Sequence, residues 1–249
     1  MAENNSSKEQ TKKAVWAGLD GIIEGLVGMV PGVGPLLQSA IYQLPQRLAA
    51  IRLEAYVNDL ADRINEVETT RNLDFPRPVD DSIRDIFVEV ARCPYEENRK
   101  YFIEMFIKVA EQKEDDVGLW RNYPEIIRLL TPLQIQLLKN YLKSMYWLEY
   151  KRAQKDQDVD IKKIDWDDEN RLFKVYGVKT KELKAAIDDL ISKGLMIDDG
   201  PGRWNTGSTR EFLKVTTLAT SLLEYVISDQ ELAEMRALAQ EGDTIDDQL

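Results

Sequence analysis

The chain has 249 residues, with 33 Lys and Arg against 44 Asp and Glu, so its formal net charge at neutral pH is -11. This balance disfavours a globally basic nucleic-acid binder but allows a local basic patch. The sequence has no histidine and one cysteine, which excludes imidazole-dependent catalysis, an internal disulfide and a cysteine-rich metal site. We therefore expect a cytoplasmic protein that is not an enzyme and has no catalytic residues, cofactor, metal or small-molecule substrate. Chemistry by carboxylates and lysines stays open as an alternative.

Residues 1–13 are polar and are expected to form a disordered tail. Residues 14–45 are predicted to form a glycine-rich apolar helical hairpin, with a turn between Pro31 and Pro35. Glycine costs a helix about 1 kcal/mol relative to alanine, so a row of glycines favours the close approach of another backbone. Five glycines, spaced 3, 4, 3 and 4 apart, share one helical face and form the candidate helix-packing or membrane face: Gly18, Gly21, Gly25, Gly28 and Gly32.

The hairpin is a poor candidate for a constitutive membrane span. The nearly uncharged stretch from Gly25 to Ile41 is marginal in length, and prolines interrupt it. Asp20 and Glu24 would resist deep insertion at neutral pH. We therefore expect self-association or a protein partner, with membrane association on activation as an open alternative.

Residues 46–130 are predicted to form a helical bundle. The first helix, over 46–68, carries an apolar row at spacings of 4, 3, 4 and 3, which is typical of a buried face and is favoured over a coiled-coil dimer seam: Leu53, Val57, Leu60, Ile64 and Val67. A neighbouring stripe holds Leu44, Leu48, Ile51 and Ala55. Further helices are expected over 81–93, capped by Asp80 or Asp81 and ended by Pro94, over 95–112 and over 120–130. The single cysteine, Cys93, is predicted to be a packed thiol.

Residues 131–228 are predicted to form a winged-helix-like domain with a small β-hairpin. The expected order is a helix over 132–151, an acidic linker over 153–170, a helix after Thr180, strands at 195–197 and 212–215, and a helix after Thr217. Thr131, Thr180 and Thr217 are the predicted N-caps. Residues 229–249 are expected to be an acidic tail.

The winged-helix-like region also holds the candidate partner or DNA contacts. Lysines at the start of a recognition helix and basic or aromatic residues in a wing would suit phosphate contacts: Lys179, Lys181, Lys184, Arg203, Trp204 and Arg210. Glu182 and Asp188 lie among them and would repel phosphate. Protein contact is therefore favoured, and DNA binding is the alternative.

The order of these segments resembles the Abi-alpha family, bacterial proteins of unknown biochemical activity that are linked by name to abortive infection by phage. The resemblance covers most of residues 16–227. Two departures are Ala219, where the family often has glycine, and Phe106, near a position where the family has tryptophan. The matching segments are the glycine-rich opening, PQRLAAIRLEAYVNDLADRINEVE, LDFPRP, YEENRKYFIEMFIKVAEQ, YPEIIRLLTPLQIQLLKNYL, LISKGLMI and LKVTTLATSLLEYV.

The resemblance implies a role in phage defence by stopping the infected host, and it supplies no catalytic residues. The sequence thus predicts a mainly α protein that acts without catalysis, through assembly or conformational release of residues 14–45. The alternative is a winged-helix DNA-binding transcriptional regulator.

Overall fold

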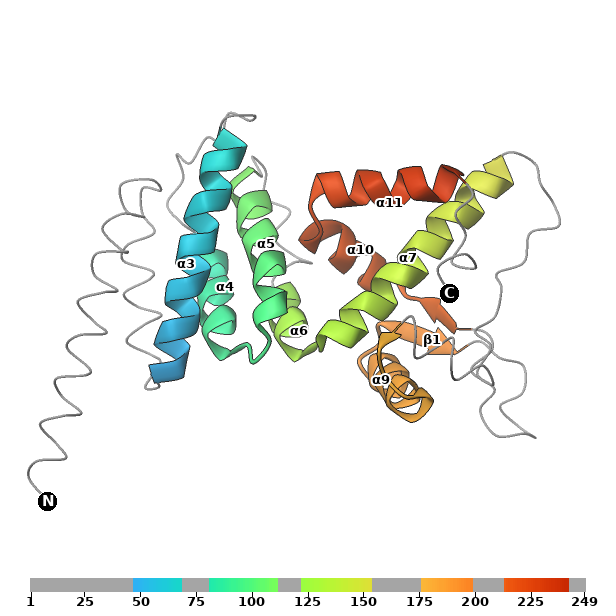
Figure 1. The fold of residues 1–249 in the computed structure, drawn as a ribbon, viewed down its shortest axis with the longest axis horizontal. Helices are drawn as coiled ribbons and strands as arrows, with labels where there is room; N and C mark the ends of the chain where they lie inside the picture. Colours follow the sequence, from blue (N-terminus) through green and yellow to red (C-terminus); the bar gives the residue numbers. More distant parts are fainter. Residues whose placement is uncertain (1–46, 69–80, 112–121, 154–175, 199–212, 242–249) are drawn as a thin grey trace, which may run out of the picture. The chain divides into compact units, whose positions relative to one another are not determined.

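The computed structural model describes residues 47–68, 81–111, 122–153, 176–198 and 213–241 (Figure 1). These residues are mostly helical and include one two-stranded antiparallel sheet, which confirms the mainly α prediction. The chain divides into two compact units, residues 1–129 and residues 130–249. The predicted hairpin of 14–45 and all but the first residue of the predicted linker 153–170 lie outside the described residues.

In the first unit, helices that follow one another in sequence pack against each other. In Figure 1, α3, α4 and α5 lie side by side, and α4 contacts α3, α5 and α6. The elements are α3 (Arg47–Glu68), α4 (Asp81–Arg92), the 3-10 helix η1 (Glu96–Asn98), α5 (Arg99–Glu111) and α6 (Tyr123–Leu129).

The core of this unit contains the apolar row predicted for the first helix. Leu53 and Leu60 are fully buried, and the three other members of the row are also buried. Tyr56 lies in the same core, where its ring meets Phe87 edge-on at 5.7 Å between centroids and its hydroxyl donates to the Phe102 carbonyl at 3.2 Å. The phenol therefore enters the core with its polar atom paired.

The start of α5 differs from the prediction of a helix from residue 95. A 3-10 turn precedes it, and the α-helix begins at Arg99. Asn98 explains the change, because it is fully buried and its Nδ2 donates to the Ile127 carbonyl at 3.0 Å. This bond ties the chain before α5 to α6, and propensity alone does not predict it.

In its described residues, the second unit contains four helices and a short hairpin. The strands are antiparallel, with Met196 opposite Val215 and Asp198 opposite Leu213. Up to α10 the described elements follow the predicted order: α7 (Pro132–Ala153), α9 (Thr180–Ser192), β1 (Met196–Asp198), β2 (Leu213–Val215) and α10 (Thr217–Val226). They are followed by α11 (Asp229–Glu241).

Helix α11 differs from the predicted acidic tail of 229–249. Residues 229–241 are helical and pack against α7 (Figure 1). Leu232, Met235 and Ala239 are buried at spacings of 3 and 4, and Ser228 Oγ accepts from the Glu231 amide at 3.2 Å. An apolar stripe and a capping serine therefore outweigh the acidic composition that favoured a tail.

Two of the three predicted N-caps are displaced by one residue. Thr131 does cap α7, in a reciprocal box with Gln134 whose two bonds measure 2.9 and 3.2 Å. Helix α9 instead begins at Thr180, because Lys179 holds the extended backbone of the cap position. Helix α10 is capped by Thr216, whose hydroxyl accepts from the Ala219 amide at 3.2 Å.

Candidate functional site

The predicted glycine face lies outside the described residues, but the helix that follows it is described. Three of the four members of the second apolar stripe belong to α3, and we call Leu48, Ile51 and Ala55 the α3 apolar stripe. Leu48 is 61% exposed and Ile51 is 46% exposed, whereas Ala55 is half-buried. Exposed large aliphatic side chains this close together favour a contact with another apolar segment.

The composition of this face changes partway along α3. The stripe runs from Leu48 to Ala55, which is about 10 Å of helix. The next positions on the same face are Asp59, Asp62 and Glu66, all exposed carboxylates. The apolar surface is therefore limited to the N-terminal turns of α3, next to the point where residues 1–46 enter.

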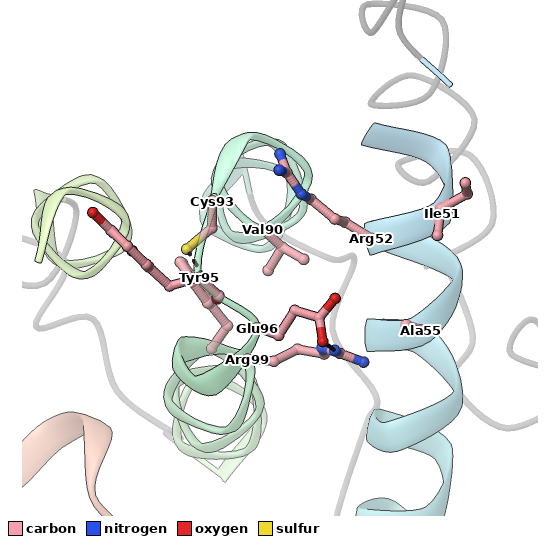
Figure 2. Close-up of a pocket in the computed structure, with 9 residues that line it drawn as sticks. Ile51, Arg52, Ala55, Val90, Cys93, Tyr95, Glu96 and Arg99 are labelled. Atoms are coloured by element: carbon pink, nitrogen blue, oxygen red, sulfur yellow. Dashed lines mark hydrogen bonds and ion pairs between the residues drawn. The ribbon is translucent and has the colours of Figure 1, made fainter. Parts of the chain in front are cut away.

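A small pocket lies beside the stripe, between α3, the end of α4 and the start of α5. Its volume is about 50 Å³, which is room for a few water molecules and far below the size of a typical ligand site. Figure 2 shows Glu96 and Arg99 between α5 and α3, and Arg52 extending from α3 towards α4. Two members of the stripe, Ile51 and Ala55, also line the pocket. The sequence alone did not predict this pocket, because its lining comes from three separate segments.

Arg99, which lines the pocket, pairs with two carboxylates. Arg99 Nη1 lies 3.0 Å from Asp59 and its Nη2 lies 3.8 Å from Glu96. Because these pairs are largely exposed, each is worth little to stability, and they mainly fix the orientation of the side chains.

Cys93 lines the pocket and is 5% exposed, which confirms the predicted packed thiol. Its Sγ donates to the Tyr95 carbonyl at 3.5 Å. Burial raises the pKa of the thiol, so the protonated form dominates at neutral pH. A thiol in this form is a weak nucleophile and a weak metal ligand.

The candidate contact residues of the second unit are only partly described. Lys179 and Lys181 are exposed at the start of α9, and Lys184 is half-buried one turn later. The first two are therefore both open to solvent at the start of one helix, but residues two apart do not share a helical face. Exposed Glu182 lies among them. The proposed wing contacts lie outside the described residues: Arg203, Trp204 and Arg210.

Asp189 is exposed on α9 and also bonds to a second helix. Its carboxylate accepts from Lys193 Nζ and from Gln134 Nε2, and these bonds lower its pKa. Gln134 is 2% exposed and also donates to the Ala186 carbonyl at 3.3 Å. Asp189 therefore joins α9 to the start of α7.

Over the described ranges, no cluster of three or more acidic, cysteine or histidine side chains is placed to hold a metal ion. No helix in those ranges combines the length and the apolar character that crossing a bilayer requires. No family model, curated protein or solved structure matches this chain. The function is therefore argued from the residues themselves.

Proposed function

We propose that the protein is a non-enzymatic phage-defence factor of the abortive-infection kind, which acts through assembly or conformational release of residues 14–45. The observation that carries this proposal is the exposed α3 apolar stripe directly after the glycine-rich segment. The predicted glycine face and the α3 apolar stripe are adjacent in sequence. The N-terminal segment could therefore exchange a contact with α3 for a contact with another chain. The Abi-alpha resemblance supplies the biological setting.

The mechanism we propose needs two properties of the N-terminal segment. The glycine row would let a second backbone approach closely, which strengthens dispersion contacts along the whole row. Asp20 and Glu24 would keep the segment from deep insertion into a bilayer at neutral pH. Association with a protein partner or with another copy is therefore favoured over membrane insertion.

Substitution of Gly25 by leucine tests this proposal. A side chain in the middle of the glycine row would force the partner backbone away, and overpacking of this kind costs roughly 1–3 kcal/mol. We expect association to weaken by about tenfold or more and phage protection to fall with it. The measurements are sedimentation velocity of the purified protein and plating efficiency of phage on cells that express it.

Val27→Leu is the matched control, because it adds bulk to the same predicted helix outside the glycine row. It should leave both association and protection unchanged. If Gly25→Leu behaves like this control in both assays, the glycine row is not the working surface. Liposome flotation of the same variants shows whether a bilayer takes the place of the protein partner.

A second candidate function rests on the exposed lysines of α9. We propose that residues 131–228 form a winged-helix-like domain, with α9 as its second helix and residues 199–212 as the wing. The support is the order of α7, α9, β1, β2 and α10 and the antiparallel pairing of the two strands. Lys179 and Lys181 at the start of α9 would then contact phosphates.

Charge reversal separates the DNA-binding hypothesis from the defence hypothesis. If the domain binds DNA, Lys179→Glu/Lys181→Glu should weaken binding and reduce the salt slope by about one for each phosphate that the variant no longer neutralises. Lys100→Glu is a matched control, since it reverses an exposed lysine of the first unit. The measurement is fluorescence anisotropy with labelled duplex DNA over a salt series. Equal binding by all three proteins removes the regulator hypothesis.

A further inference from the structure

The described residues cover the α3 apolar stripe only in part, although it lies on a well-packed helix. Ile51 and Ala55 line the small pocket beside α4 and α5, but Leu48 and Ile51 remain exposed. Leu48 and Ile51 are among the most exposed large apolar side chains in the described ranges. The opposite side of α3 is buried against its neighbours in the first unit. The exposed stripe is thus a second apolar face on a helix that already has a core face.

The sequence just before α3 supplies a segment that matches this face. Residues 35–44, PLLQSAIYQL, contain no charged residue. Only Pro45 and Gln46 separate them from Arg47, where α3 begins. A connection this short between two helices makes them antiparallel neighbours.

The apolar positions of the two segments mirror each other about Gln46. Leu44, Ile41 and Leu37 are spaced 3 and 4 apart going backward, just as Leu48, Ile51 and Ala55 are spaced going forward. Antiparallel pairing therefore sets Leu44 against Leu48, Ile41 against Ile51 and Leu37 against Ala55. This spacing is the one that places all three side chains of each helix on a single face.

The lengths of the two segments also agree. In the same register Pro35 falls opposite Val57, so a helix that starts at Pro35 would end its contact there. The first carboxylate on this face of α3 is Asp59, which lies just past that point. The acidic half of the face therefore begins where its apolar partner would stop.

We propose that residues 35–44 dock as an antiparallel helix on the α3 apolar stripe and hold the glycine-rich segment at rest. This inference rests on the proposed function, because a resting state has a role only if the segment is later released. It adds the surface from which the segment would be released. The docking itself is a separate claim, because it can hold or fail whatever the protein does in a cell.

Hydrogen exchange of the full chain, followed by mass spectrometry, tests the docking. In Leu48→Glu/Ile51→Glu, two carboxylates would meet Leu44 and Ile41, and the amides of residues 36–44 should exchange about tenfold faster or more. Both sites are exposed, so the amides of α4 and α5 should keep their protection and show that the first unit is folded.

Asn58→Glu is the matched control, because it places the same charge on the same side of α3 beyond the paired length. It should leave residues 36–44 as protected as in the unaltered protein. Three outcomes overturn the proposal: no protection of these amides in the unaltered chain, equal loosening by the variant and the control, or unchanged protection in the variant. If the last comes with conversion of a dimer to a monomer in sedimentation, a second copy occupies the stripe.

These outcomes are independent of the phage assay. Residues 36–44 of Leu48→Glu/Ile51→Glu could exchange faster while Gly25→Leu behaves like its Val27→Leu control. That pair of results would support the docking and reject the proposed function. If Gly25→Leu abolishes phage defence, but the amides of residues 36–44 exchange as slowly in Leu48→Glu/Ile51→Glu as in the unaltered protein, the proposed function is supported and the docking is rejected.

Discussion

At the scale of single residues, the buried tyrosines show how burial sets chemistry in this protein. Tyr56 is fully buried, and desolvation raises the pKa of its phenol well above the usual value. Burial also raises the pKa of Tyr141 and Tyr176 in the second unit. All three phenols therefore stay neutral at pH values where an unfolded chain would ionise them.

This difference predicts a loss of stability in alkali. Unfolded chains release the phenol proton above about pH 10, while the folded state retains it, so unfolding is coupled to proton release. The contribution is complete below about pH 10. Above it, the free energy of unfolding should fall by up to about 1.4 kcal/mol per pH unit for each such tyrosine. Urea unfolding followed by circular dichroism at about pH 8, 10 and 11 measures the fall.

Tyr56→Phe isolates one phenol in that experiment. At about pH 8 it should cost about 1 kcal/mol, because it removes the hydrogen bond to the Phe102 carbonyl. Its stability should then decline less steeply with pH than that of the unaltered protein. Parallel curves for the two proteins would show that Tyr56 ionises equally in both states and would contradict this account.

At the scale of helices and strands, apolar periodicity predicted most of what the structure describes. The row from Leu53 to Val67 indicated the core face of α3, and the threonine before Pro132 indicated the start of α7. These features depend on residues close together in sequence. Local patterns of this kind suffice when the same side chains that set the period also make the contacts.

The errors share a different cause. The N-caps of α9 and α10 fall one residue early because backbone conformation at Lys179 and Thr216 decides them, and neighbouring threonines look alike in sequence. Helix α11 was not predicted, because the acidic composition of the segment hides the spacing of Leu232, Met235 and Ala239. The links from Asn98 to α6 and from Gln134 to α9 join distant segments, so no local pattern indicates them.

The sequence also predicted the candidate sites only in part. The second apolar stripe of α3 is visible in the sequence, but its exposure is a property of packing that only the structure gives. The pocket at Cys93 needs three segments to be brought together. The lysines of α9 were placed on the right helix, because a short amphipathic segment between Gly177 and Gly194 fixes their face.

At the scale of the whole molecule, we propose that two adjacent stretches of residues 14–45 make two different contacts. In the resting state that we propose, residues 35–44 would lie on α3, and after release the glycine row next to them would contact a second chain. The two contacts use different residues, so each can be removed without the other. Substitution on α3 should therefore promote assembly, while substitution in the glycine row should prevent it.

The most direct measurement is sedimentation velocity of the Leu48→Glu/Ile51→Glu protein with and without Gly25→Leu. The first protein, with its segment undocked, should sediment as a larger species than the unaltered chain. Adding Gly25→Leu should return it to the original size, because released segments could no longer pack closely. An undocked protein that stays the size of the unaltered chain, or a larger species that survives Gly25→Leu, would contradict the account.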